Sequence, residues 1–360
     1  MNIYINDITE SASNLLATHG ILTGTSVKEG LARLNDLSGD TMTLFVLDKQ
    51  GSIIGTVTDG DVRRALISGI RLDEGIEAVM NRKFLFADSE DHLPMKMEEG
   101  RRRHIELLPL IVNGILKDII DLRTTKSFIP VEAVLMAGGR GERLRPLTDS
   151  VPKPLLHVGD KAIIDYNVED LESCGIKKIY VTVNYLADQI ESHFSESGHR
   201  AEIECVREPK RLGTLGSVSL IENITSKDII LMNSDLLTSV DFHSMYVQHH
   251  NSGSDITVGA VPYSVSIPFA IMNMKNDRVL ELEEKPTYNY FANAGVYIIR
   301  SELLKKMVKD EYLDAPDFVS SVIKDGGNVG CYHIEGTWID IGSPDDYRMA
   351  CELMSRRLKL

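Results

Sequence analysis

The residues with the clearest chemical potential lie in one stretch, Leu135–Leu155, which reads LMAGGRGERLRPLTDSVPKPL. The apolar run 131–136 predicts a buried strand, and glycines follow it at once. Glycine adopts positive φ and lets backbone N–H groups approach an anion closely. The same stretch gathers four cationic side chains: Arg140, Arg143, Arg145 and Lys153. An anionic, phosphate-rich ligand is the simplest reason to collect them at the end of a strand.

This stretch is neither a P-loop nor the G-x-G-x-x-G dinucleotide fingerprint. It resembles the signature of the sugar-1-phosphate nucleotidyltransferases, A-G-G-x-G-[TE]-R-L-x-P-L-T-x-x-x-P-K-P, at nearly every position. Glu142 stands where threonine is commoner, although glutamate also occurs in the family. The alternative interpretation is a glycine turn surrounded by solvated arginines.

The resemblance implies that a sugar-1-phosphate oxygen attacks the α-phosphorus of a nucleoside triphosphate and expels pyrophosphate. Positioning and charge stabilisation can carry most of such a reaction. By its place in the motif, Arg143 is expected to grip the departing phosphates, and Lys153 to neutralise the reacting ones. The nucleotide-binding residues implied around them are Leu135, Ala137, Gly138, Gly139, Gly141, Glu208, Gly213 and Thr214.

Two aspartates match the metal-binding motifs of the same family. Asp235 stands in LMNSDL, after an apolar strand, and Asp340 stands in WIDIG. Carboxylate oxygens suit Mg²⁺, so the resemblance implies a Mg²⁺ cofactor held by this pair, with Asp235 essential for catalysis. By itself, an aspartate at a strand end is more often a cap or turn residue.

Sugar contacts are implied by two further motifs. Glu284 and Lys285 stand in EEKP, and Asn293 and Gly295 stand in NAGVY. The family uses such residues to bind sugar hydroxyls and the sugar phosphate. Without the resemblance, the first motif would be a solvated strand end and the second a turn.

The choice of base depends on Glu208, which precedes LGTLG and resembles a segment of guanylyltransferase-like members. A carboxylate can accept hydrogen bonds from both N1–H and the exocyclic amine of guanine, whereas uracil and thymine offer one N–H. Because an unpaired buried carboxylate is costly, Glu208 favours GTP. The alternative is a surface glutamate before a proline turn.

The first part of the chain shows a degenerate repeat of helix, strand, turn, strand and helix. One pass covers 27–68 and the second starts at Leu93, with strands at 107–112 and 115–120. The segment LFVLDKQGSIIGTVTDGDVRRAL resembles a cystathionine-β-synthase-type (CBS) module, whose Thr and Asp hold the ribose of an adenine nucleotide. Thr58 and Asp61 match those positions, and the second module has no equivalent. The pair could therefore sense an adenine nucleotide or serve only in dimerisation and packing.

The second part alternates strands and helices, which predicts a mostly parallel sheet with helices on both faces. Expected strands cover 131–136, 178–183, 202–206 and 228–232, and expected helices cover 162–174, 187–194, 215–222 and 242–250. Further strands are expected at 256–261, 269–273, 279–283 and 294–299. The predicted fold class is a Rossmann-like α/β nucleotidyltransferase (131–360), joined through a linker (126–130) to a tandem CBS pair (1–125).

Composition limits the partners. The net charge of −14 argues against nucleic acid and against an anionic membrane surface. We expect no membrane span and no signal peptide, and we expect four reduced thiols, mostly in the core, in a cytoplasmic protein.

A CBS pair ahead of a nucleotidyltransferase resembles bacterial enzymes associated with legionaminic acid and other surface glycans. The resemblance implies a GDP-linked glucosamine or N-acetylglucosamine as the product. We also expect a homo-oligomer. Mannose-1-phosphate guanylyltransferase shares every motif and remains an alternative. An alternative of another class is a catalytically silent sensor of nucleotide sugars or adenylates.

Overall fold

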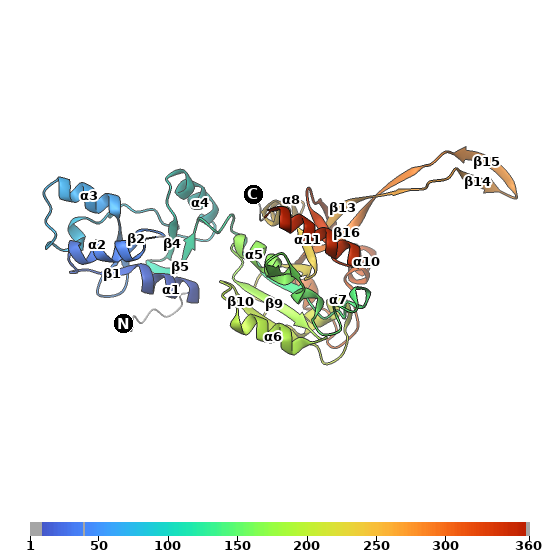
Figure 1. Cartoon of the computed structure of the whole chain (residues 1–360), viewed down its shortest axis with the longest axis horizontal. Coiled ribbons are helices and arrows are strands. Elements are labelled where there is room, and N and C mark those ends of the chain that lie inside the picture. Colours follow the sequence, from blue (N-terminus) through green and yellow to red (C-terminus); the bar gives the residue numbers. More distant parts are fainter. Residues whose placement is uncertain (1–8, 39, 358–360) are drawn as a thin grey trace. The chain divides into compact units, whose positions relative to one another are not determined.

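The computed structural model describes residues 9–38 and 40–357, which separate into two compact units between Phe128 and Ile129 (Figure 1). This boundary lies inside the expected linker 126–130. No described helix is long and apolar enough to cross a membrane.

The first unit begins with one complete module around a three-stranded sheet of order β1-β2-β3. Its elements are β1 (Gly20–Leu22), α2 (Val27–Asp36), β2 (Thr43–Leu47), β3 (Ile53–Thr58) and α3 (Asp59–Ile67). Both helices start at capping boxes, Ser26 with Glu29 and Thr58 with Asp61, as the S/T-x-x-D/E spacing predicts. The expected order of the first pass is therefore present.

The second module lacks the closing helix that the repeat predicts. After a short 3₁₀ helix, η1 (Ile76–Ala78), it contains α4 (Leu93–Arg102) and the hairpin β4 (Leu107–Val112) and β5 (Ile115–Asp121). Turns and irregular backbone follow β5, because LRTTKSFIP offers no apolar helical face. Instead α1 (Glu10–His19), from the other end of the unit, covers the hairpin. Its Ala12 and Leu16 are buried with Leu116 and Ile119.

The second unit is built on a seven-stranded sheet of order β10-β9-β6-β11-β16-β13-β17. The strands are β6 (Glu132–Met136), β9 (Lys178–Val183), β10 (Glu202–Arg207), β11 (Asp228–Asn233), β13 (Ile256–Ser266), β16 (Thr287–Arg300) and β17 (Val329–His333). Only β16 runs antiparallel to both its neighbours, so the expected mixed, mostly parallel sheet is confirmed.

Helices cover both faces of this sheet (Figure 1). Successive residues of β6 point to opposite sides: Leu135 joins the core under α5 (Ile163–Ser173), α6 (Ala187–Glu196) and α8 (Phe242–Asn251), and Val134 faces the other side. That side is covered by α9 (Ser301–Leu304) and α10 (Ala315–Lys324), together with α7 (Gly213–Gly216) and the 3₁₀ helix η4 (Ser217–Leu220).

The expected helix 215–222 is wrong as a single α-helix, since α7 and η4 take its place. The N–H groups of Leu215 and Gly216 donate to the Leu313 carbonyl, outside the helix. A Cβ at Gly216 would lie 2.4 Å from the Glu311 carbonyl oxygen, so the 311–313 loop passes very close. These hydrogen bonds to the 311–313 loop replace the backbone hydrogen bonds of a longer helix.

The outer ends of β13 and β16 leave the sheet and continue into the ribbon β14 (Ile271–Lys275) and β15 (Arg278–Glu283) (Figure 1). We call residues 262–291 the arm. Ten large apolar side chains of the arm are exposed: Tyr263, Val265, Phe269, Met272, Met274, Val279, Leu280, Leu282, Tyr290 and Phe291. The expected strands 256–261 and 294–299 are only the inner parts of longer strands.

The cysteines differ from expectation. None of the four forms a disulfide, but only Cys174 is buried, and Cys331 is exposed on β17. The prediction that most of them lie in the core is therefore wrong. Cys205 is half-buried, and burial raises the pKa of its thiol to about 11.

Candidate active site

Two aspartates far apart in sequence meet at the end of the sheet. Asp235 follows β11 and directly precedes β12 (Leu236–Thr238). Strand β12 pairs antiparallel with β18 (Trp338–Asp340), and this register places Leu236 opposite Asp340. The Ile341 N–H donates to the Asp235 carbonyl at 3.2 Å. The ribbon β12–β18 thus brings the two carboxylates to one place.

Lys153 connects these carboxylates to the glycine-rich stretch. It begins the 3₁₀ helix η3 (Lys153–Leu155), and its ammonium contacts Asp235 Oδ2 and lies 3.5 Å from Asp340 Oδ1. Its side chain is only 11% exposed. Burial, together with the neighbouring charge of Asp235, raises the pKa of Asp340 above its ordinary value. The charges are therefore packed closely and partly desolvated.

Arg143 lies at the same place from the other side. It belongs to the 3₁₀ helix η2 (Glu142–Leu144), and its guanidinium packs on Gly342, where a Cβ would lie 3.0 Å from Nη2. Its positive charge acts to lower the pKa of Asp340. The structure therefore brings Arg143, Lys153, Asp235 and Asp340 together. Of the other expected cations, Arg140 is exposed and Arg145 pairs with Asp149 at 3.2 Å.

A pocket of about 180 Å³ opens beside this cluster. Six of the expected nucleotide-site residues line it: Ala137, Gly138, Gly139, Glu208, Gly213 and Thr214. Leu135 does not, because its side chain is fully buried in the core beneath the pocket. Gly141 also lies outside the lining; its φ of 60° turns the chain into η2, and a Cβ there would lie 3.1 Å from Lys153 Cβ.

Glu208 forms one wall of the pocket. Its side chain is buried, and Oε2 accepts the Leu212 N–H at 3.1 Å. Oε1 lies against Gly138, where a Cβ would come within 2.4 Å of it, so a side chain at this position would displace the carboxylate. Burial raises the pKa of the Glu208 carboxyl above its ordinary value.

Several lining residues were missed by the sequence analysis: Met136, Pro154, Thr182, Arg211, Asn233, Ser234 and Asp314. Arg211 adds a further cation, and its place directly before LGTLG was a usable signal. Asp314 is the N-cap residue of α10, and its side chain accepts the Thr214 N–H at 2.9 Å. No sequence pattern connects Thr214 with Asp314, because they lie 100 positions apart.

The four expected sugar-site residues separate into two groups. Gly295 has a φ of 70° and packs on Asn233, a lining residue, and Asn293 Oδ1 accepts the Gly295 N–H at 2.9 Å. Glu284 and Lys285 lie on the arm, where both are exposed, and they do not line the pocket. The structure therefore does not bring the EEKP motif to the other residues of this chain's site.

One observation favours a second cation beside the aspartates, in addition to the Lys153 ammonium. Asp235 Oδ1 is buried and has no hydrogen-bond partner, although its other oxygen contacts Lys153. A buried carboxylate oxygen without a partner is costly, and oxygen donors of this kind are the ligands of hard divalent ions. Asp235 and Asp340 therefore fit a divalent metal ion.

In the first unit, the side chains of Thr58 and Asp61 form a hydrogen bond with each other. Thr58 Oγ1 donates to Asp61 Oδ2 at 2.7 Å, and Arg64 pairs with Asp61 Oδ1 at 2.6 Å. These contacts cap α3 and account for both side chains locally.

Residues 132–356 match the model of the family described as "Nucleotidyl transferase". The chain belongs to this family. The match covers the second unit, which holds the glycine-rich stretch and the pocket. The nucleotidyl transferase fold expected from the signature is thereby confirmed.

Curated relatives match the same part of the chain. A putative mannose-1-phosphate guanyltransferase of Sulfolobus acidocaldarius is 31% identical over 230 residues, covering 62% of this chain and 64% of that protein. A D-glycero-alpha-D-manno-heptose 1-phosphate guanylyltransferase of Aneurinibacillus thermoaerophilus is 27% identical over 223 residues, covering 61% of this chain and 96% of that protein. This chain thus spans less than two thirds of the length of the Sulfolobus protein.

Among solved structures, HddC from Yersinia pseudotuberculosis matches with a TM-score of 0.50 and 24% identity. The match covers 62% of this chain and 99% of HddC. At this identity, the likeness establishes a shared fold.

Proposed function

We propose that this protein transfers GMP from GTP to a sugar 1-phosphate, giving a GDP-sugar and pyrophosphate. The observation that carries the proposal is the position of the Lys153 ammonium, between Asp235 and Asp340 at the edge of a glycine-lined pocket. Two polyanionic substrates repel each other, and the pocket gathers cations and backbone N–H groups where they would meet. Family membership and the names of the relatives support the same reaction.

In this reaction a phosphate oxygen of the sugar 1-phosphate bonds to the α-phosphorus of GTP. The bond from that phosphorus to the oxygen bridging the α- and β-phosphates breaks, and pyrophosphate leaves. Lys153 neutralises the reacting phosphates, and Arg143 holds the departing ones. The backbone of Gly138 and Gly139 cradles the triphosphate. No side-chain nucleophile is needed.

We propose Mg²⁺ as the cofactor, held by Asp235 and Asp340. When bound, such an ion neutralises charge on the phosphates and aligns the attacking and leaving oxygens. Asp340 must be ionised to contribute, and its raised pKa places that ionisation higher in pH than for an ordinary aspartate.

GTP is proposed as the donor because Glu208 offers a buried carboxylate to the pocket. Oε2 is engaged by the Leu212 N–H, and Oε1 lies against Gly138 in the pocket wall. A carboxylate pairs with the adjacent N1–H and N2–H donors of guanine, and it has no such pair on uracil or thymine. Both curated relatives described above are named as guanylyltransferases.

For the acceptor we propose glucosamine 1-phosphate or N-acetylglucosamine 1-phosphate, within nonulosonic acid or surface glycan synthesis. The support is the resemblance of the first unit to a CBS pair, a combination typical of such enzymes. Mannose 1-phosphate is the main alternative, and the Aneurinibacillus relative adds a heptose 1-phosphate.

The test is a matrix of ATP, GTP, UTP, CTP and dTTP against glucosamine, N-acetylglucosamine, mannose and heptose 1-phosphates, read by pyrophosphate release. The proposal predicts release that needs GTP, a sugar phosphate and Mg²⁺ together. Absence of release with every pair, despite GTP binding, would favour the silent sensor instead.

We also propose that the first unit is a regulatory CBS pair binding an adenine nucleotide near Thr58 and Asp61. Its complete first module supports this proposal, as does the parallel bridge Ala87–Leu110, which repeats the parallel pairing of β1 with β2. A ribose would have to replace the hydrogen bond between Thr58 and Asp61.

Finally, we propose a homo-oligomer in which the arm packs on a second copy of the chain. A two-stranded ribbon with apolar side chains exposed along it is marginal alone in water. The arm also carries Glu284 and Lys285, which the family motif assigns to the sugar phosphate, out of this chain's own pocket. Packing on a second copy would cover the apolar side chains and place these two residues near that copy's site.

A further inference from the structure

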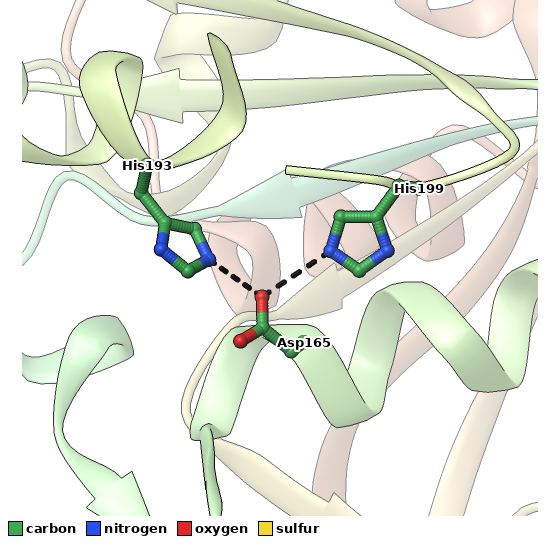
Figure 2. Close-up of side chains that lie close together, drawn as sticks. All are labelled: Asp165, His193 and His199. Carbon is green, nitrogen blue, oxygen red and sulfur yellow. Dashed lines mark hydrogen bonds and ion pairs between the residues drawn. The ribbon is translucent and has the colours of Figure 1, made fainter. Parts of the chain in front are cut away.

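A second cluster of metal-ligating side chains lies outside the candidate active site. Asp165 stands in the first turn of α5, His193 near the end of α6, and His199 in the segment before β10. Figure 2 shows both imidazoles pointing at the same carboxylate. Asp165 Oδ1 lies 2.6 Å from His193 Nε2 and 3.3 Å from His199 Nε2. We propose that these three residues bind a divalent transition-metal ion of the zinc class.

The spacing of the ligand atoms fits such an ion. Among the described residues, this is the one group of three or more ligating side chains whose ligand atoms all lie within 4.8 Å of one another. Ligands about 2.0–2.2 Å from a tetrahedral zinc stand roughly 3.3 Å apart. The two separations from Asp165 Oδ1, 2.6 Å and 3.3 Å, are close to this value.

The chemistry of the donors separates this site from the proposed Mg²⁺ site. Two imidazole nitrogens and one carboxylate oxygen suit zinc, whereas Mg²⁺ prefers oxygen ligands throughout. Three protein ligands leave a fourth position for water. The site is partly open, because the side chains of His193 and His199 are 29% and 12% exposed.

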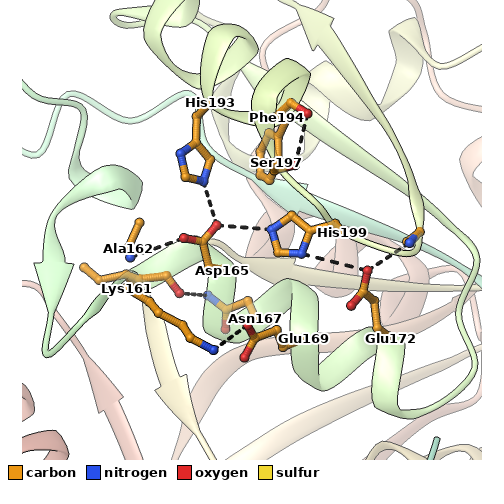
Figure 3. A network of polar contacts seen from close by, with 12 residues as sticks. Lys161, Ala162, Asp165, Asn167, Glu169, Glu172, His193, Phe194, Ser197 and His199 are labelled. Atoms are coloured by element: carbon orange, nitrogen blue, oxygen red, sulfur yellow. Dashed lines mark hydrogen bonds and ion pairs between the residues drawn. The ribbon is translucent and has the colours of Figure 1, made fainter. Parts of the chain in front are cut away.

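Surrounding groups hold the ligands in place (Figure 3). Asp165 Oδ2 accepts the Ala162 N–H at 3.3 Å, which leaves Oδ1 facing the rings. The other nitrogen of His199, Nδ1, lies 3.9 Å from Glu172 Oε1. Glu172 is buried and accepts the Ala201 N–H at 2.8 Å. A carboxylate behind a histidine ligand is the usual way to orient the ring and keep Nε2 available for a metal.

The site would join three segments, one of which contacts the candidate active site. On α5, two residues beyond Asp165, Asn167 donates its side-chain amide to the Ser234 carbonyl at 3.2 Å. Ser234 directly precedes Asp235. A metal bound at the start of α5 would tie this helix to α6 and to the segment entering β10. The inferred role is structural, and it does not depend on the proposed reaction.

The test is a zinc titration of the chelator-treated full-length protein by calorimetry, with Mg²⁺ in excess to occupy oxygen sites. The proposal predicts one equivalent of zinc per chain and a higher melting temperature on binding. Replacing zinc by Co²⁺ should give a visible spectrum without a thiolate charge-transfer band, which excludes the exposed Cys331 as the ligand.

Matched variants locate the ion. The double variant H193A/H199A should no longer bind the equivalent of zinc. Asp235→Asn should still bind it, as should His157→Ala, which changes an exposed histidine of the same unit. Glu172→Gln should weaken zinc binding about tenfold while the three ligands remain. The inference is overturned if the wild-type protein takes up no zinc under these conditions, or if the double variant keeps the full equivalent. Zinc uptake by the wild-type protein can be measured whether or not any variant folds. If no zinc is taken up, Asp165 forms only ion pairs with the two histidines.

Discussion

At the residue scale, the proposed reaction depends on the ion cluster of Lys153, Asp235 and Asp340. Composition and spacing could place these residues in family motifs, but they could not show the contact. That contact depends on the pairing of β12 with β18, in which Leu236 lies opposite Asp340. Strands of three residues carry too little periodicity to be recognised in a sequence.

Asp235→Asn should remove turnover and leave the fold intact. The amide keeps the size of the side chain but provides neither the charge facing Lys153 nor an anionic metal ligand. We expect a loss of at least about 1,000-fold in kcat, equivalent to several kcal/mol of transition-state stabilisation. Pyrophosphate release and urea unfolding measure the two effects separately. Asp188→Asn, at an aspartate that is 89% exposed, is the control; activity retained in Asp235→Asn would remove this residue from the site.

Glu208 should make GTP binding depend on pH. Because burial raises the pKa of its carboxyl, more of it is protonated in mild acid than for an ordinary glutamate. The protonated form accepts poorly from guanine, so GTP affinity should rise with pH through that raised pKa. Glu208→Gln should flatten this dependence and weaken GTP binding by about 10- to 100-fold, the effect of losing a charged hydrogen bond. An unchanged profile in Glu208→Gln would contradict the assignment.

The same pKa shift has a consequence for stability. A carboxyl whose pKa is higher in the folded than in the unfolded state stabilises the fold below its ordinary pKa. That contribution is lost as pH rises through the folded pKa. Glu208→Gln should therefore unfold at a higher denaturant concentration than the wild type near neutral pH, although it binds GTP less tightly.

At the element scale, regular elements with caps or strong periodicity were predictable. The strand 178–183 has the expected bounds, α8 ends one residue later than expected, and α5 is one residue shorter than expected at each end. The predictions of secondary structure failed where tertiary contacts determine the local structure. The helix α1 covers the β4–β5 hairpin from the other end of the unit, and α7 stops because the 311–313 loop passes against Gly216.

Gly213→Ala tests the close approach that shapes the pocket. Gly213 has a φ of 80°, and a Cβ there would lie 2.6 Å from the Leu313 carbonyl oxygen. The change should cost about 1–3 kcal/mol of unfolding free energy and raise the KM for GTP. Gly198→Ala, where no atom lies within 4 Å of the added Cβ, should stay within about 0.5 kcal/mol of the wild type. If the two changes had equal effects on stability and KM, the close approach of the 311–313 loop to Gly213 would not shape the pocket.

The arm should determine the oligomeric state. Phe269 and Leu280 are 72% and 62% exposed, so replacing both by serine leaves the fold of the chain intact. We expect the double variant to give a smaller species than the wild type in light scattering after gel filtration. Ile323→Ser, at an exposed position of α10, is the matched control. A wild-type protein that is monomeric at micromolar concentration would rule out the proposed packing of the arm.

At the scale of the whole molecule, the sequence motifs identify the second unit more firmly than the first. The glycine-rich stretch was long and mixed enough in composition to identify the family of the second unit from sequence. The first unit offers only Thr58 and Asp61, and the capping of α3 accounts for both side chains. The motif was therefore visible in the sequence, but it does not separate a ribose site from a helix cap.

Calorimetric titration of the full-length protein with AMP and ATP tests the first unit. Binding should be present in the wild type and lost in Asp61→Ala, while Asp59→Ala, in the same helical turn, keeps it. Both variants should remain folded, since loss of a helix cap costs about 1 kcal/mol. Absence of heat from either nucleotide would leave the pair as a packing or dimerisation element.

The pocket is proposed to support the transfer of GMP from GTP to a sugar 1-phosphate. This transfer is tested most directly by following GTP labelled separately at the α- and γ-phosphates in the presence of the acceptor sugar phosphates. The account predicts that the α-label enters a nucleotide sugar and the γ-label enters pyrophosphate. Recovery of the γ-label as inorganic phosphate or on the sugar, with no labelled nucleotide sugar, would contradict it.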